Sequence, residues 1–415
     1  HLEFLWDKDL MDYLGIVRFR SNPDLIKWTK HKFSITEMSQ MKSILCTRAG
    51  KNTGDANRQE GYTFQHNLNY PEYEFRVSFM AHQLLRNSKT SLARENKDND
   101  LIGTITGYSC TIRIQETNKL ILKPEDLNLG DDIVAELHQA YNTKSGITCI
   151  TGAPGAGKNT TYSSIVNANN NREMIVWEVG SPIEYKLPIT QINVESYEHM
   201  KNVVKTSKTQ DIDKIIITEF RDSEMGHLIK DTVISNMSVL LTMHITRVWD
   251  FIEKYREYFG PNDYRTMVMY TRQISHQVMF KKLCDNCKKP LHYKDMNQQE
   301  RDAYKSLKLE GTTVYIANRD EDSDCRIQCL GGFLTTRLPA AESLLLTRQD
   351  KRASVLLDNM LSADTEVEMR NLVKNYMVNN GKSLEYKIRE RIINGEIDFR
   401  EVIRLEIFEE VQSEK

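Results

Sequence analysis

Apolar and polar positions follow two different patterns along the chain, and the change falls near residue 146. After that point, short apolar runs at 146–151, 174–179, 214–218 and 239–243 are separated by longer helical stretches. Apolar runs of this length, without strict alternation, are typical of strands that are buried on both faces. We therefore predict a parallel sheet that is covered by helices on both faces.

The earlier part of the chain alternates apolar and polar residues one by one. Residues 15–20 and 73–79 show this alternation, which is typical of half-buried strands, and 110–114 predicts another strand. Residues 86–100 are polar and highly charged, so we expect an exposed loop or insertion there. Together these segments predict a first domain over residues 1–120.

The rest of the chain divides into three parts. Residues 121–145 carry a proline, a glycine and many charges around a short helix, which predicts a hinge or linker. A second domain then covers 146–415. Within it, residues 281–337 contain paired cysteines, and residues 340–415 are rich in helical patterns.

Composition excludes several classes of protein. At 415 residues the chain is too long for one small core, and its 40% hydrophobic and 27% charged content is ordinary for a globular protein. We expect no membrane insertion, because no apolar run approaches the ~18 residues of a membrane span. The net charge of −2 gives no general drive toward nucleic acid. Because the chain begins with His1 rather than Met, we also expect that a more N-terminal segment or domain is not included.

The clearest motif is the glycine-rich segment 152–160. It fits G-x-x-x-x-G-K and lies between a predicted strand and a predicted helix. Backbone N–H groups and the helix N-terminus then face one anion, while Lys158 reaches the β- and γ-phosphates of a nucleotide. The expected nucleotide-binding residues are Gly152, Pro154, Gly155, Ala156, Gly157, Lys158, Asn159 and Thr160.

One position of this loop departs from the motif. Asn159 stands where Ser or Thr normally offers a hydroxyl to Mg²⁺. An amide oxygen is also a ligand for a hard cation, although it reaches further than a hydroxyl. The alternatives are that Thr160 supplies the hydroxyl, or that water molecules and acidic residues hold the metal.

Polar residues at the ends of neighbouring strands are the expected partners of the loop. Glu219 ends the run 214–218, and we expect it to act as the base or to orient water. Glu184 follows the run 174–179 and is expected to hold Mg²⁺ through water, and His244 ends a third strand. The plainer alternatives are an exposed strand-end acid and a structural histidine.

The cysteines point to a metal and to a reducing compartment. Two close pairs form a C-x2-C and C-x3-C set, which consists of Cys284, Cys287, Cys325 and Cys329. Four thiolates at such spacing close a tetrahedral Zn²⁺ site without an open position, so its role is structural. Reduced cysteines without metal are the alternative. The remaining cysteines, Cys46, Cys110 and Cys149, are scattered in apolar contexts.

These motifs, in this order, resemble those of the secretion ATPases that drive type II secretion and type IV pilus assembly. The family's phosphate loop, aspartate box, Walker B sequence and histidine box are similar to residues 152–160, 176–185, 218–222 and 241–244. The chain departs from the family at Ser181, which replaces the aspartate of the box, and at Thr218, which replaces the Walker B glycine. Such divergence most resembles type IVb systems such as the bundle-forming and toxin-coregulated pili.

The first domain resembles the family's second N-terminal domain. In the family, two arginines from that domain approach the nucleotide, and by motif they map to Arg76 and Arg113. A strand arginine that faces solvent is the plainer alternative. The family's more N-terminal domain, which docks on membrane-associated partners, is expected to be missing from this chain.

The resemblance implies an α/β fold, with a RecA-like P-loop ATPase domain after a smaller PAS-like α/β domain, a tetracysteine zinc insertion and a helical C-terminal region. It also implies a cytoplasmic hexameric ATPase that uses ATP and Mg²⁺, lies peripherally at the inner face of the bacterial inner membrane and powers type IV pilus assembly. Its partners would be an inner-membrane platform protein and other pilus components, without nucleic acid. The alternatives are a type II secretion ATPase with the same chemistry and a catalytically weak nucleotide-binding scaffold.

Overall fold

The chain divides into two units, His1–Lys119 and Leu120–Lys415. This computed structural model describes residues 2–7, 12–21, 24–48, 61–65, 73–87, 101–116, 120–170, 173–181, 183–319, 325, 329 and 331–404. In the first unit it describes side chains only between residues 33 and 47. The expected loop at 86–100 therefore falls outside the description, apart from its first two residues.

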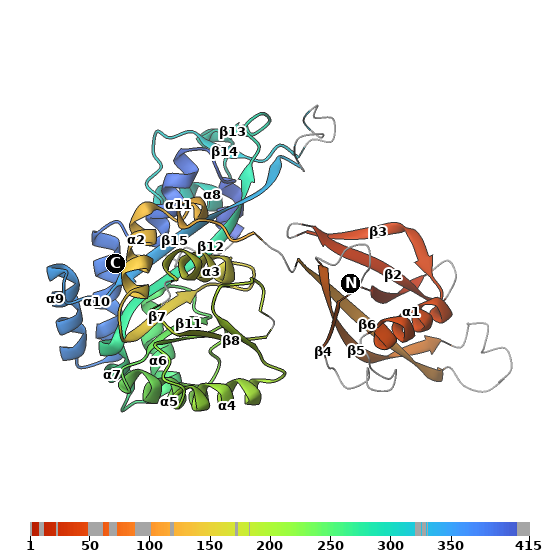
Figure 1. Cartoon of the computed structure of the whole chain (residues 1–415). Coiled ribbons are helices and arrows are strands. Elements are labelled where there is room, and N and C mark those ends of the chain that lie inside the picture. The colour runs from red at the N-terminus through yellow and green to blue at the C-terminus, as the bar shows by residue number, and fades with distance from the viewer. Residues whose placement is uncertain are drawn as a thin grey trace. The chain divides into compact units, whose positions relative to one another are not determined.

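In the described residues of the first unit, an antiparallel sheet is accompanied by the helix α1 (Figure 1). The strand order is β3-β2-β1-β6-β5-β4. The elements are β1 (Leu2–Asp7), β2 (Asp12–Ser21), β3 (Asp24–Phe33), α1 (Ile35–Arg48), β4 (Gly61–Gln65), β5 (Tyr73–Asn87) and β6 (Leu101–Glu116). The three strands predicted from alternation lie inside β2, β5 and β6, so that prediction is confirmed.

The second unit is built on a seven-stranded sheet of order β15-β12-β7-β11-β10-β8-β9. Its strands are β7 (Gly146–Thr151), β8 (Val176–Gly180), β9 (Thr190–Asn193), β10 (Lys214–Ile217), β11 (Ser238–Met243), β12 (Thr271–Leu283) and β15 (Phe333–Leu345). The four predicted apolar strands are β7, β8, β10 and β11. The prediction of a purely parallel sheet is wrong at one edge, because β15 runs antiparallel to β12. The cysteine segment connects β12 to β15. Because the chain reverses its direction in that segment, β15 pairs with β12 in the antiparallel sense.

Helices cover both faces of this sheet, and the pleat of β10 shows how. Ile215 and Ile217 pack into the core under α4 (Tyr197–Ser207), α5 (Ser223–Ile234), α6 (Phe251–Phe259) and α7 (Tyr264–Tyr270), while Ile216 packs into the core on the other face. Successive strand residues point to opposite faces, so a strand with two covered faces needs a continuous apolar run. The predicted two-sided cover is confirmed.

Residues 121–145 belong to the second unit. They form a short 3-10 helix, η3 (Pro124–Leu127), and α2 (Asp131–Tyr141). Their apolar side chains share a core with α3 (Lys158–Asn169) and the sheet. Lys214 is buried in this region, with its Nζ 2.6 Å from Ser238 Oγ and 4.4 Å from the centre of the Tyr141 ring.

The cysteine segment packs with the C-terminal helices around a core of its own, which contains Phe280, Leu291, Tyr304, Ile388 and Phe399. Its elements are β13 (Lys289–Leu291), η5 (Tyr293–Asp295), α8 (Gln298–Ser306) and β14 (Val314–Ile316). The helices that follow β15 are α9 (Lys351–Ser362), α10 (Glu366–Asn379), α11 (Leu384–Ile393) and α12 (Phe399–Arg404).

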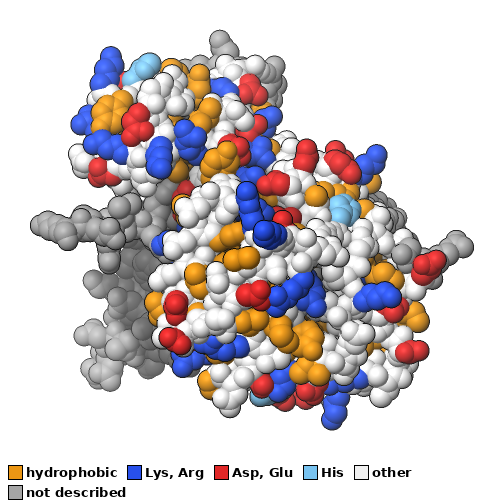
Figure 2. Space-filling model, turned by 90° about the vertical axis from the view of Figure 1, so that its left-hand side faces the viewer, with side chains coloured by type: hydrophobic (Ala, Val, Ile, Leu, Met, Phe, Trp, Pro, Cys, Tyr) orange, Lys and Arg blue, Asp and Glu red, His pale blue; other side chains and the backbone are white. Residues whose placement is uncertain are grey.

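Two surface properties bear on possible partners. None of the helices in the described ranges combines the length and the apolar character that a membrane crossing requires. On the face drawn in Figure 2, basic and acidic side chains are interspersed with apolar ones.

Candidate functional site

The phosphate loop joins β7 to α3 and depends on its glycines. Gly152, Gly155 and Gly157 have φ angles of 148°, 79° and 86°, which L-residues rarely adopt. A Cβ on Gly152 would lie 2.5 Å from the carbonyl oxygen of Gln277. The sequence therefore needs glycine at these positions to leave the N-terminus of α3 open to an anion.

Lys158 begins α3 and folds back over its own loop. Its Nζ donates to the carbonyl oxygens of Gly152 at 2.7 Å and Ala153 at 3.2 Å. Burial lowers the pKa of Lys158 to about 8, while the carboxylate charges of Glu219 and Glu184 act in the opposite direction. An anion bound at the loop would favour the charged form of Lys158, because an opposite charge raises the pKa of a buried ammonium.

The three expected residues lie in the segments that follow β8, β10 and β11, which are parallel neighbours in the sheet that carries the phosphate loop. Glu219 and Glu184 are both close enough to influence the pKa of Lys158 electrostatically. The Nδ1 atom of His244 lies 2.8 Å from the carbonyl oxygen of Gly152 and 3.5 Å from Lys158 Nζ. Because a carbonyl only accepts, His244 Nδ1 carries the proton in this contact. Glu219 also forms an ion pair with Arg221.

The positions that depart from the expected motifs have identifiable neighbours. Thr160 Oγ1 lies 2.7 Å from the hydroxyl of Tyr185, so one possible metal ligand has a protein partner. Asn159 is half-buried in the first turn of α3. The side chain of Thr218 packs directly against Gly180. A Cβ at position 180 would lie 2.4 Å from Thr218 Oγ1, so position 180 has room only for glycine while Thr218 is present.

Sequence reasoning missed two residues that support the loop. Gln277, buried in β12, donates to the Ala156 carbonyl at 2.5 Å and accepts from Thr161 Oγ1 at 3.0 Å. Glu178, buried in β8, accepts from Tyr162 at 2.6 Å, and burial raises its pKa. The sequence signal available for both residues is a charged or amide side chain within an otherwise buried strand. Such a side chain requires a specific hydrogen-bond partner.

The two candidate arginines lie in the first unit. Arg76 in β5 and Arg113 in β6 are direct partners in the antiparallel register. Their side chains lie outside the described part of the structure, so their approach to a nucleotide stays a prediction.

The four paired cysteines form one cluster. Their sulfur atoms all lie within 4.8 Å of one another, with Cys284–Cys325 and Cys287–Cys329 separations of 3.5 Å. Backbone bonds from Cys287 N to Cys284 O and from Cys329 N to Cys325 O close a tight turn at each pair. Tetrahedral zinc with bonds of about 2.3 Å requires sulfur separations of about 3.8 Å. The cluster therefore fits Zn²⁺. Of the other cysteines, Cys46 and Cys149 are buried thiols, as expected.

A family profile described as "Type II/IV secretion system protein" matches residues 10–404. A putative type II secretion system protein E of Escherichia coli K12 is 23% identical over 214 residues, which are 51% of this chain and 42% of that protein. The type IV pilus assembly ATPase PilB of Thermus thermophilus is 23% identical over 188 residues, or 45% of this chain and 21% of PilB.

The chain thus spans less than half the length of these two curated relatives. Among solved structures, the Legionella pneumophila ATPase DotB matches with a TM-score of 0.60 at 16% identity. The match covers 95% of this chain and 88% of the DotB chain, and it concerns the fold.

Proposed function

Because the chain belongs to the type II/IV secretion system protein family, we propose that it is an ATPase motor whose catalytic centre is the phosphate loop 152–160. One observation carries the proposal. His244 Nδ1 lies 3.5 Å from Lys158 Nζ at the phosphate loop, and the charges of Glu219 and Glu184, in the segments that follow β10 and β8, act on Lys158. This is the arrangement that phosphoryl transfer needs, with a phosphate cradle, acidic groups and a polar sensor at one edge of the sheet.

Each residue then has a distinct role. Lys158 and the loop amides hold the phosphates, and Glu219 orients the attacking water once it is released from Arg221. Asn159, Thr160 and Glu184 are the residues that would hold Mg²⁺, which neutralises charge on the phosphates when it is bound. His244 senses the γ-phosphate, because its Nδ1 already contacts the first residue of the loop.

We further propose that Arg76 and Arg113 close on the γ-phosphate. Their direct pairing in the register of β5 and β6 supports a joint role, and arginine is well suited to bind phosphate groups. In this proposal the first unit is the PAS-like domain and the second unit is the RecA-like domain of a cytoplasmic homo-hexamer.

The proposed biological role is type IV pilus assembly. The tetracysteine cluster, which fits Zn²⁺, favours assembly over pilus retraction, because in the family this element is typical of the assembly and secretion branches. The motor would lie at the inner face of the inner membrane and act on a platform protein. A type II secretion motor is the second candidate, favoured by the relative in Escherichia coli that carries that name.

Phosphate release from purified protein with MgATP tests the proposal. Lys158→Ala should weaken triphosphate binding and abolish turnover, whereas Glu219→Gln should retain binding and lose turnover. Lys205→Ala, at an exposed position of α4, is a matched control and should behave as wild type. A Glu219→Gln variant with wild-type turnover would overturn the assignment of Glu219. Wild-type protein that binds ATP without turnover would favour the scaffold alternative.

A further inference from the structure

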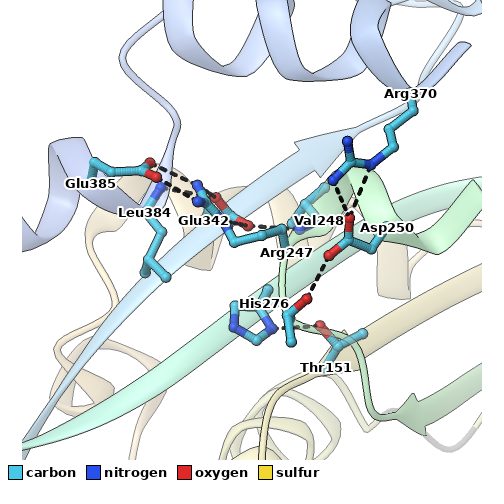
Figure 3. A network of polar contacts seen from close by, with 10 residues as sticks. Thr151, Arg247, Val248, Asp250, His276, Glu342, Arg370, Leu384 and Glu385 are labelled. Atoms are coloured by element: carbon cyan, nitrogen blue, oxygen red, sulfur yellow. Dashed lines mark hydrogen bonds and ion pairs between the residues drawn. The ribbon is translucent and has the colours of Figure 1, made fainter. Parts of the chain in front are cut away.

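The segment that follows β11 connects the phosphate loop to the C-terminal helices. It begins at His244, which contacts Gly152, and ends in the short 3-10 helix η4 (Val248–Asp250). We call residues 244–250 the histidine loop. Two separate ion-pair networks, drawn in Figure 3, fix this loop to elements more than 90 residues away in sequence.

The first network is centred on Arg247, a buried residue with a relative exposure of 6%. Its guanidinium donates from Nε to Glu342 at 3.3 Å and from Nη2 to Glu342 at 3.2 Å. The same guanidinium donates to both carboxylate oxygens of Glu385, at 2.7 Å from Nη2. Arg247 therefore binds β15 and the first turn of α11 at the same time.

Glu342 joins the same elements a second time. Its side chain is fully buried and accepts from the backbone N–H of Val248 at 2.6 Å and of Leu384 at 2.9 Å. One carboxylate thus accepts hydrogen bonds from two residues of the histidine loop, Arg247 and Val248, and from the N-terminus of α11. These donors offset the cost of burying a carboxylate, because an unmatched buried charge is strongly destabilising.

The second network ties the end of the loop to α10. Asp250 accepts from Thr246 Oγ1 at 2.6 Å, within the loop itself. Its other carboxylate oxygen accepts from Nε and Nη2 of Arg370 at 3.1 and 3.0 Å. The histidine loop is therefore fixed to two helices. Arg247 of the loop binds Glu385 of α11, and Asp250 of the loop binds Arg370 of α10.

A cavity of about 890 Å³ lies between these networks and the phosphate loop. Its walls include Ala153 and Pro154 from the phosphate loop, His244 and Arg247 from the histidine loop, and His276 from β12. The space leaves His244 room to shift when a nucleotide occupies the phosphate loop. Its position then depends on how firmly the rest of the histidine loop is anchored.

We propose that Arg247 is a positioning residue, which acts through Glu342 and Glu385 to hold His244 against the phosphate loop and to couple nucleotide binding there to α11. The inference rests on the proposed function, because it requires a nucleotide at the phosphate loop. Helix α11 also belongs to the core of the cysteine segment, through Ile388. The coupling therefore extends from the nucleotide to the zinc-binding part of the unit.

A variant that loosens the coupling without emptying the buried site is Glu385→Gln. The side chain of Glu385 is 31% exposed, so the substitution should disturb the buried core little. It removes one of the two carboxylate charges that pair with Arg247 and leaves the other, Glu342, in place. We expect turnover to fall about tenfold or more, because small displacements of a catalytic group have effects of this size. The KM for MgATP should stay within about twofold. Arg247→Lys should also lose turnover, because an ammonium lacks the fork that reaches both carboxylates.

A double-mutant cycle with His244→Ala separates positioning from a general structural role. If Glu385 acts through His244, the double variant should turn over ATP at the rate of His244→Ala alone. Glu396→Gln is the control, since Glu396 pairs with Arg391 of α11 at 2.8 Å without contacting the histidine loop. It should behave as wild type. Additive losses in the cycle, or an equal loss in the control, would overturn the proposal.

Hydrogen exchange gives a readout that does not require turnover. In the wild type, a non-hydrolysable ATP analogue should protect both the phosphate loop and the first turn of α11. In Glu385→Gln it should protect the phosphate loop alone. Protection of the phosphate loop without any change in α11 of the wild type would refute the coupling and leave the proposed function intact. A wild-type phosphate loop that shows no protection would refute both.

Discussion

Raising the pH above about 8 should weaken nucleotide binding, because it removes the proton from Lys158. Burial lowers the pKa of this lysine to about 8, and its Nζ is bonded to the carbonyl oxygens of Gly152 and Ala153 rather than to an anion. A triphosphate favours the ammonium form, so the pKa of Lys158 is higher in the complex than in the free protein. Binding above pH 8 must therefore take up a proton, and affinity falls as the pH rises.

The size of the effect follows from the position of that pKa. At pH 7.5 most of the protein carries the ammonium, whereas at pH 9.5 the protonated fraction is only about 3% for a pKa of about 8. Between pH 7.5 and pH 9.5 the dissociation constant should then rise about 25-fold, which is about 2 kcal/mol of binding free energy.

A fluorescent ATP analogue, titrated between pH 7.5 and 9.5 at constant ionic strength and Mg²⁺, measures this directly. Lys158→Met should bind weakly at every pH, because it has no proton to lose. Lys205→Ala should follow the wild-type curve. A wild-type dissociation constant that stays level over this range would show that Lys158 remains charged in the free protein, and the reasoning from its burial would fail.

Four further predictions address the metal, the fold and the arginines. Asn159→Thr should lower the Mg²⁺ concentration for half-maximal turnover, since it restores a compact hydroxyl ligand; an unchanged requirement would mean that Asn159 is not near the metal. Metal analysis should find one zinc per chain, and Cys284→Ser should lower both the zinc content and the melting temperature; zinc-free protein with four titrating thiols would contradict this. Lys214→Met should raise the free energy of unfolding by roughly 2–4 kcal/mol near pH 7.5, because burial lowers the pKa of Lys214 to about 7 and the unfolded chain binds the extra proton. The free energy of unfolding of the wild type should thus rise with pH between about 7 and 10.5. Over the same range, the extra stability of Lys214→Met, measured by denaturant titration, should shrink. A stability difference between the two proteins that does not change with pH would contradict the lowered pKa of Lys214. Arg76→Ala and Arg113→Ala should each reduce turnover on the order of 10³-fold with ADP affinity unchanged, and turnover within about twofold of wild type would reject that role.

The sheet could be predicted largely because its central strands are buried on both faces and are mostly apolar. β7, β10 and β11 are buried over their full length, so each appears in the sequence as a short apolar run. β12 gave no such signal, because it buries Gln273, Ser275, His276 and Gln277. Several of these polar groups have partners far away in sequence; Gln273, for example, donates to Ser343 at 2.8 Å. A pattern read along one strand contains no information about such a partner.

The same distinction applies to the candidate site. The ends of parallel strands meet at one edge of a sheet, so Glu219, Glu184 and His244 could be grouped from sequence alone. The ion pair between Glu219 and Arg221 could not be predicted, because it depends on the conformation of the chain after β10. The network of Arg247 was also out of reach, because its carboxylates are 95 and 138 residues away.

The close approach of Gly180 to Thr218 limits the order in which this chain can change. A larger residue at 180 would collide with the threonine, since its Cβ would lie 2.4 Å from Oγ1. Thr218→Gly removes that obstacle and should be tolerated first, whereas Gly180→Ala in the present background should damage the strand edge beside Glu219. Substitution of Thr218 by the glycine that is typical of the family can therefore come first in evolution. Substitution of Gly180 by a larger residue can follow it but cannot precede it.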